Sequence, residues 1–329
     1  MSALAPTLQA FFTHRLVQQR HASPHTIAAY RDAWRLLVRF AADHLAKAPS
    51  QLEIGDIDAP LVGHFLAHLE HDRANTVRTR NARLSAIHAL FRYAALEHPE
   101  HAAVIARVLA IPRKRSPYRL VTFLADGEVD ALLAAPDRTT WTGRRDHTLL
   151  ALAIQTGLRA SELIGLRRAD LHLARGAYVN CLGKGRKQRI TPLTRPLTAA
   201  LRTWLAERND IPDAPVFPTR SGQPLSRDAL AQRLAKHVAT AARACPSLGE
   251  KTVTPHTLRH TAAMRLLHAG VDTTVIALWL GHEHVDTTSI YIHADLALKE
   301  RALARVAPAS VHAGRYRPSD SLLDFLEGL

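Results

Sequence analysis

Apolar residues recur every three or four positions through the first third of the chain, the spacing of one face of an α-helix. Ser23 and Pro24 suit an N-cap and the first helical position, and they precede the apolar set Ile27, Tyr30, Trp34, Leu37, Val38 and Ala41. A second helix is predicted to begin near Asn75-Thr76, with Leu84, Ile87, Leu90, Phe91 and Ala94 on one side. Residues 1–112 are therefore predicted to form a helical domain.

The pattern changes after this region. The segment Ile111-Pro-Arg-Lys-Arg-Ser-Pro117 contains two prolines and three consecutive cations, which interrupt the helical periodicity. We expect a basic linker over residues 113–119, and such a run of cations is able to follow a nucleic-acid backbone. A plain basic hinge would mark the same domain boundary.

Helical periodicity returns in a second predicted domain, over residues 120–310. Its helices are expected around 126–135, 145–157, 160–166, 195–208, 226–244, 256–269 and 272–280. One β-hairpin is predicted to interrupt them. Apolar and polar residues alternate over 178–182, residues 183–187 supply a glycine-rich turn, and 189–191 form the returning strand. The expected fold class is mainly α with a small β-sheet. A tail helix over 311–329 carries an apolar stripe that needs a partner surface, on its own domain or on a neighbouring protomer.

Charge narrows the function classes. The 329 residues include 43 Lys and Arg against 29 Asp and Glu, a net charge of +14. Such an excess favours a polyanionic partner, nucleic acid first and an acidic membrane surface second. There is no apolar run of ~20 residues and no secretory pattern at the start. With only two cysteines, Cys181 and Cys245, outside any metal-like or redox pair, the chain is expected in the cytoplasm.

Arg159 is the first candidate for phosphate chemistry. It follows Gly157 at the end of an apolar helix, and Glu162 stands three residues later on the same helical face. A guanidinium group binds phosphate through two parallel charge-assisted hydrogen bonds, and Glu162 could orient it. An ordinary surface ion pair has the same spacing.

A second cationic group lies near the C-terminal end. Thr254-Pro255 fits an N-cap and first helical position, which places His256 in the first turn and Arg259 one turn later. His260 is four residues from His256, but the zinc-protease motif needs Glu where Thr257 stands, so no metal is expected.

Three further residues complete a set for cleaving a phosphodiester. His282 follows Leu280-Gly281, and Tyr291 stands nine residues later. A phenol attacks near neutral pH only when a base or nearby cations favour its ionised form. Lys184, between two glycines in the β-turn, could donate the proton that a leaving oxygen needs, a role that Lys187 or Arg189 could also fill.

Together these motifs resemble the tyrosine site-specific recombinase family of lambda-integrase and Xer type. The resemblance covers most of the chain and implies a SAM-like helical core-binding domain before an α+β catalytic domain. It makes Arg159, Lys184, His256, Arg259, His282 and Tyr291 the catalytic set, with Glu162 and His260 in support. Tyr291 would join the DNA 3′-phosphate and release a 5′-hydroxyl.

The resemblance also implies partners. Double-stranded DNA would be the substrate, bound by four protomers on two sites, with no cofactor, ATP or metal and no small-molecule substrate or membrane. The expected DNA contacts come from one cationic helix face, the linker and the hairpin: Thr76, Arg80, Arg83, Arg113, Lys114, Arg115, Lys187 and Arg189.

Three other functions fit parts of this pattern. A type IB topoisomerase-like enzyme would use a similar site to relax DNA. A DNA-binding factor could keep the fold without activity. A basic RNA-binding protein is the third, although no RNA-binding motif is found. A product that joins two specific sites would separate a recombinase from a topoisomerase, and a covalent adduct would exclude the inactive factor.

Overall fold

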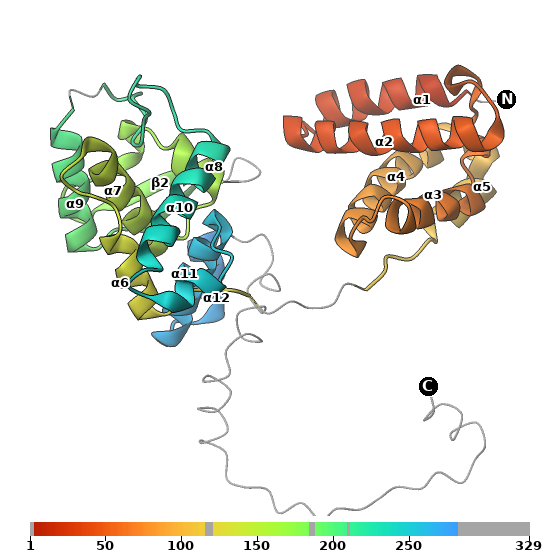
Figure 1. Ribbon diagram of the computed structural model, residues 1–329. Coiled ribbons are helices and arrows are strands. Elements are labelled where there is room, and N and C mark those ends of the chain that lie inside the picture. The colour runs from red at the N-terminus through yellow and green to blue at the C-terminus, as the bar shows by residue number, and fades with distance from the viewer. Residues whose placement is uncertain (1–2, 116–120, 184–187, 209–210, 282–329) are drawn as a thin grey trace, which may run out of the picture. The chain divides into compact units, whose positions relative to one another are not determined.

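The computed structural model describes residues 3–115, 121–183, 188–208 and 211–281. The chain divides into two compact units, Met1–Tyr118 and Arg119–Leu329, which Figure 1 colours from red to orange and from yellow to blue. This division falls within the segment expected to be a linker. The expected tail helix over 311–329 lies outside the described residues.

The first unit is helical. Its elements are α1 (Leu4–Ala10), the π-helical η1 (Phe11–Gln19), α2 (Pro24–Leu45), η2 (Pro49–Gln51), η3 (Ile54–Asp56), α3 (Ala59–His71), α4 (Val77–Glu97), η4 (Pro99–His101) and α5 (Ala102–Leu109). Ser23 caps α2 as predicted, because its Oγ accepts from the Thr26 amide. The predicted start of the second helix near Thr76 also agrees with the structure, where Thr76 Oγ1 accepts from the Thr79 amide and caps α4. Trp34 on α2 and Phe91 on α4 are buried in one core, their ring centroids 6.4 Å apart.

The cationic face expected on α4 is only partly exposed. Thr76 is exposed and Arg83 half-buried, but Arg80 is buried, with 7% of its side chain exposed. Its guanidinium donates to the main-chain oxygen of Pro112 at 3.1 Å. The expectation that Arg80 shares an exposed face with Thr76 is therefore wrong, because the start of the linker covers it.

The first linker residues pack against the first unit. Lys114 exchanges two hydrogen bonds with Asn81 of α4, at 2.8 and 3.2 Å, and its ammonium lies 2.6 Å from a carboxylate oxygen of Glu70 on α3. Arg113 donates to the hydroxyl of Ser85, and Arg115 is exposed. The chain leaves this unit along α4.

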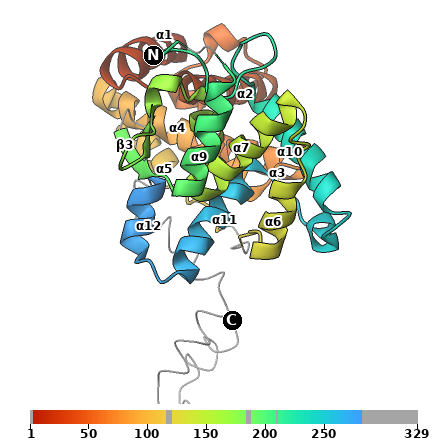
Figure 2. The same cartoon turned by 90° about the vertical axis from the view of Figure 1, so that its left-hand side faces the viewer.

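The second unit is also mainly helical. Its helices are α6 (Asp126–Ala134), α7 (Trp141–Thr156), α8 (Ala160–Gly165), α9 (Arg195–Ala206), α10 (Arg227–Ala241), α11 (Pro255–His268) and α12 (Thr273–Leu280), with short turns η5 (Arg168–Asp170) and η7 (Pro246–Glu250). α7 packs against α6, α9 and α11, and α11 packs against α12, as Figures 1 and 2 show. The helices agree with the predicted ranges to within a few residues, except that α7 begins earlier.

A small antiparallel sheet lies between α8 and α9 in the sequence. It has the order β1 (Leu171–His172), β2 (Tyr178–Leu182) and β3 (Gln188–Pro192). Cys181 pairs with Arg189 across the predicted hairpin, and Val179 pairs with Thr191. β1 was not predicted, because two residues are too short to show alternation. The predicted fold class, mainly α with a small sheet, is confirmed.

A buried ion network joins α7 to α10. Arg145 has no exposed side-chain surface, and its Nε and Nη2 donate to Asp146 Oδ1 at 2.9 and 2.6 Å. The other carboxylate oxygen of Asp146 lies 2.9 Å from His237 Nε2 on α10, and Arg145 Nη1 donates to the main-chain oxygen of Pro218. Every charge in this network has a partner, as buried charges require.

Candidate functional site

Arg159 lies where the chain enters α8, and Glu162 holds it in two ways. As the N-cap residue, Arg159 donates its main-chain N–H to Glu162 Oε2 at 2.8 Å. Its guanidinium donates through Nη1 to Glu162 Oε1 at 2.8 Å and through Nη2 to the main-chain oxygen of Gly281 at 2.9 Å. Because 29% of the Arg159 side chain stays exposed, it is open to an anion while its orientation is fixed.

Arg189 on β3 binds the same carboxylate. Its Nη1 and Nη2 donate to the two oxygens of Glu162 at 3.0 and 2.7 Å, a two-point contact. Only 11% of the Arg189 side chain is exposed, against 5% for Glu162. Burial opposes ionisation of Glu162, but hydrogen bonds from Arg189 and Arg159 outweigh it and lower the pKa of the carboxyl to about 2. Arg189, expected to grip DNA, thus lies mostly inside, facing Glu162.

The Arg259 side chain, on α11, is hydrogen-bonded to two main-chain oxygens. Its Nη1 donates to the oxygen of Gly157 at 2.7 Å and its Nη2 to the oxygen of Leu280 at 2.7 Å. The residue is buried, with 3% exposed. Arg259 therefore bridges the C-terminal ends of α7 and α12, and Arg159 bonds the very next carbonyl after Leu280.

Two glycines make this convergence possible. Gly157 and Gly281 end α7 and α12 in left-handed conformations, with φ of 64° and 66°, which favour glycine. A Cβ on Gly157 would lie 2.5 Å from Leu280 Cδ2, and one on Gly281 would lie 2.9 Å from Arg189 Nη1. Side chains at either position would push the arginines and α12 apart.

His256 and His260 lie one turn apart on α11. Thr254 caps this helix and Pro255 is its first residue, as predicted. His256 is exposed in the first turn, and its ring centroid is 5.3 Å from that of half-buried His260. Burial, together with the neighbouring His256 and Arg259, lowers the pKa of His260 to about 4. His260 is thus neutral at physiological pH.

The described structure brings together some of the predicted residues. Arg159, Glu162, Arg189 and Arg259 converge on the end of α12, and His256 stands one turn before Arg259. Lys184, Lys187, His282 and Tyr291 lie outside the described residues. His282 directly follows Gly281, so the described site ends at the residue before it.

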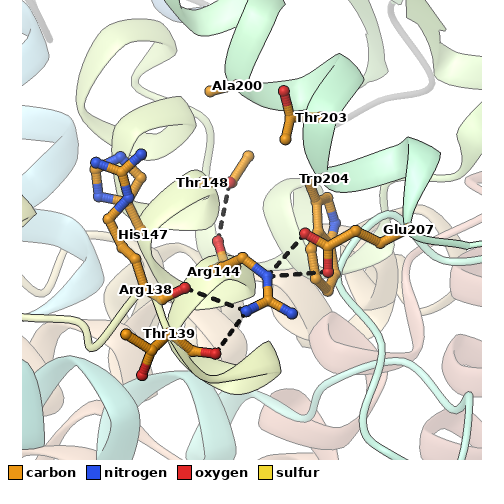
Figure 3. Close-up of a pocket in the computed structure, with 9 residues that line it drawn as sticks. All are labelled: Arg138, Thr139, Arg144, His147, Thr148, Ala200, Thr203, Trp204 and Glu207. Atoms are coloured by element: carbon orange, nitrogen blue, oxygen red, sulfur yellow. Dashed lines mark hydrogen bonds and ion pairs between the residues drawn. The ribbon is translucent and has the colours of Figure 1, made fainter.

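A separate hollow lies between α7 and α9, as Figure 3 shows. Arg144 dominates it, but its Nε is bonded to both Glu207 oxygens at 2.7 and 3.0 Å, and its Nη1 to the main-chain oxygens of Arg138 and Thr139. Among the predicted site residues that the structure describes, none lines this hollow of about 490 Å³. The guanidinium of Arg144 is paired within the protein, so we do not assign the hollow to the site.

Comparison with known proteins agrees with this architecture. Residues 122–297 match the phage integrase family, and residues 9–98 match the phage integrase N-terminal SAM-like domain. Protein y4rC of Sinorhizobium fredii, an integrase/recombinase by name, is 55% identical over 328 residues, covering 100% of this chain and 99% of that protein. Tyrosine recombinase XerC of Pelobacter propionicus is 33% identical over 297 residues, covering 90% and 93%.

Solved structures show the same fold. The XerH site-specific recombinase, in a post-cleavage complex with palindromic difH, aligns with a TM-score of 0.69 at 23% identity, covering 87% of this chain and 81% of that one. The fold is thus that of a tyrosine recombinase. The chain belongs to the phage integrase family. It is therefore a site-specific DNA recombinase, an enzyme that cleaves and rejoins DNA through a tyrosine intermediate.

Proposed function

We propose that this recombinase carries out two successive transesterifications on double-stranded DNA, with Arg159, Lys184, His256, Arg259, His282 and Tyr291 as its catalytic residues. The observation that carries the proposal is the convergence at the end of α12. Arg259 and Arg159 bond the consecutive main-chain oxygens of Leu280 and Gly281. Both guanidinium groups are thereby held beside the segment that leads to His282 and Tyr291.

In the first step the Tyr291 oxygen attacks the scissile phosphorus and forms a 3′-phosphotyrosine bond. The bond from phosphorus to the 5′-oxygen breaks, and Lys184 protonates the departing oxygen. His256 accepts the phenolic proton or hydrogen-bonds the phosphate. Arg159, Arg259 and His282 neutralise the charge that develops on the non-bridging oxygens, which is commonly the largest catalytic contribution.

In the second step a 5′-hydroxyl from the other DNA site attacks the phosphotyrosine bond and releases Tyr291. Each step exchanges one phosphodiester for another, so bond energy is kept and no ATP is consumed. Exchange between two sites needs two duplexes cut together. We therefore propose a homotetramer on two DNA sites, in the cytoplasm, that integrates or excises a mobile element.

DNA is proposed to contact both units. In the first unit the exposed candidates are Thr76, Arg113, Lys114 and Arg115, with Arg83 half-buried. Arg83 donates to the main-chain oxygen of Ala29 at 3.4 Å, a long bond that a phosphate could replace. These contacts would position the duplex rather than read its sequence.

The test is a trapped protein–DNA adduct. DNA that flanks the gene is incubated with wild type and with Tyr291→Phe, denatured in SDS and examined for protein that stays on DNA. An adduct from wild type only, mapped to one position, supports Tyr291 as nucleophile and gives the core site. An adduct that persists in Tyr291→Phe shows that another residue attacks, and products that are relaxed but never joined between sites indicate a topoisomerase.

A further inference from the structure

Arg189 changes the charge that the arginine cluster presents. Glu162 carries one negative charge and bonds the guanidinium groups of both Arg159 and Arg189, so the three side chains carry a net charge of +1. Without Arg189, the remaining pair would be neutral. Charges in partly buried surroundings are screened less than in water. The additional positive charge of Arg189 therefore strengthens the attraction between the cluster and an anion bound to Arg159.

Arg189 also contacts the end of α12. The Cβ position of Gly281 lies 2.9 Å from Arg189 Nη1 and 3.2 Å from its Cδ, while the Gly281 oxygen accepts from Arg159. Arg189 thus occupies the space beside the backbone that precedes His282. It links β3, the strand that follows Lys184 in the sequence, to both Glu162 and Gly281.

We infer that Arg189 is a positioning residue for strand cleavage, which acts through Glu162 and Gly281 rather than by gripping DNA. It keeps Arg159 from being neutralised by its own carboxylate partner, and it sets the position of the backbone before His282. This role rests on the proposed catalytic role of Arg159. It replaces the DNA contact expected from the sequence, since 89% of the side chain is covered.

The test compares two DNA substrates that carry the mapped core site. One has the normal scissile phosphate, and the other a methylphosphonate, in which a methyl group replaces one non-bridging oxygen and removes the negative charge. Adduct formation by the bound complex is timed for wild type, Arg189→Met, Arg189→Lys and the control Arg175→Met, an exposed arginine of the same unit. DNA affinity is measured in parallel.

Arg189→Met should slow adduct formation on the phosphate by roughly 10- to 50-fold, and far less on the neutral methylphosphonate. Arg189→Lys, which keeps the charge but loses the two-point contact, should recover much of the rate. Equal slowing on both substrates would show that Arg189 only maintains the local structure. Weaker DNA binding with an unchanged cleavage rate would show that Arg189 contacts DNA, as the sequence predicted. Either result overturns the inference, whereas failure of wild type to form any adduct contradicts the proposed function itself.

A second site stands on an independent observation in the first unit. A hollow of about 410 Å³ is lined by Phe11, Arg15, Arg20, Tyr30, Ser85, His88, Ala89, Arg92, Tyr93 and Arg113. Four of these described lining residues are arginines and none is acidic. Phe11 packs against Tyr30 and Tyr93, at centroid distances of 6.4 and 5.8 Å, and all three rings line the hollow with the cations.

Most of these cations lack a counter-charge. Within the ranges that the structure describes, the side chains of Arg20 and Arg92 make no hydrogen bond or ion pair, and the Arg15 side chain bonds only the neutral Gln19. Arg113, from the linker, donates a hydrogen bond to the hydroxyl of Ser85, another lining residue. Burial lowers the pKa of His88, and the charges of Arg92 and Arg113 lower it further against the effect of a hydrogen bond to Val108.

We propose that this cationic hollow binds a phosphate group, which would bring η1, α4 and the start of the linker together. Guanidinium groups from three elements suit the several oxygens of one phosphate. The phosphate comes from the DNA backbone or from a free phosphorylated molecule, and the experiment separates these sources. A DNA phosphate here would fix the linker relative to α4.

The experiment measures DNA affinity against salt for wild type, Arg20→Ala/Arg92→Ala and a control of equal charge, Arg39→Ala/Arg107→Ala, both exposed in the same unit. Loss of each phosphate contact lowers the slope of log affinity against log salt by ~1, so the first variant should lose about 2 and the control little. Inorganic pyrophosphate binding, followed by ³¹P NMR, forms the second arm.

A reduced slope for the hollow variant alone supports a DNA phosphate. Pyrophosphate binding that the same variant abolishes, with an unchanged DNA slope, supports a free phosphorylated ligand. Equal slope losses in both variants would show an effect of general surface charge only, and no effect in either arm would show that no phosphate binds in the hollow; either result overturns the proposal.

Discussion

Arg259 donates a 2.7 Å hydrogen bond to the main-chain oxygen of Leu280 and so ties α11 to the last residue of α12. A second bond of 2.7 Å reaches the oxygen of Gly157. The planar fork of a guanidinium spans two separated carbonyls, which a lysine ammonium cannot do with the same geometry. The Arg259 side chain thus holds the ends of α7 and α12 together and is also a proposed phosphate ligand.

Arg259→Ala should lower the rate of adduct formation by ~10²- to 10³-fold, the usual cost of losing one donor to a developing oxyanion. Arg259→Lys keeps the charge but not the pair of main-chain hydrogen bonds, so it should recover only part of the rate. Single-turnover cleavage and DNA affinity are measured together, with thermal unfolding as the check on folding. Equal losses of affinity and cleavage rate would speak against a role in the transition state.

Gly157→Ala should destabilise the second unit by about 3 kcal/mol, since a left-handed φ and a 2.5 Å contact with Leu280 act together. Gly176→Ala is the matched control, with φ of 75° but open space around its Cβ. It should cost about 1 kcal/mol. Urea unfolding measures both, and similar values would show that the contact with Leu280 is relieved at no cost.

His260 should make stability fall as the solution becomes acidic. Its pKa is about 4 in the fold against 6.5 as the ordinary value, so between these values the unfolded chain binds the proton and the folded chain does not. The stability from neutral His260 is complete above pH 6.5 and is lost as pH falls towards 4. Unfolding titrations of wild type and His260→Gln should show a shallower pH dependence in the variant, and parallel curves would refute this account.

Asp146→Asn should be among the most damaging changes outside the site. It leaves the fully buried Arg145 without its carboxylate partner, and breaking such a pair costs roughly 3–5 kcal/mol. Asp213→Asn removes an exposed carboxylate 3.2 Å from Arg167 and should cost less than about 1 kcal/mol. Denaturant midpoints of the two variants decide, and comparable shifts would contradict the role given to burial.

Local signals in the sequence were sufficient for the helices and for several site positions. Ser23, Thr76 and Thr254 each cap the helix that they were predicted to begin, because an N-cap bonds an amide only a few residues away. The placement of Glu162 beside Arg159 follows from the same kind of short-range spacing. The catalytic roles of these residues stay predictions.

Long-range contacts explain where the sequence misled. Arg80 is covered by Pro112, 32 residues away, and Arg189 pairs with Glu162, 27 residues away. Charge alone suggested an exposed position for both. One signal was present for Arg189: alternation along β3 places it on the same side as buried Thr191, while Ile190 is 62% exposed.

The glycine turns and main-chain bonds at the end of α12 bear on how this enzyme could be altered. Arg159, Arg259 and Gly281 come from distant parts of the chain, but each is fixed by its place at the end or on one face of a helix. A one-residue insertion in α11 before Arg259 would turn the Arg259 side chain by about 100° around the helix axis. The number of residues between the start of α11 and Arg259 is therefore fixed by the hydrogen bonds that Arg259 donates to Gly157 and Leu280.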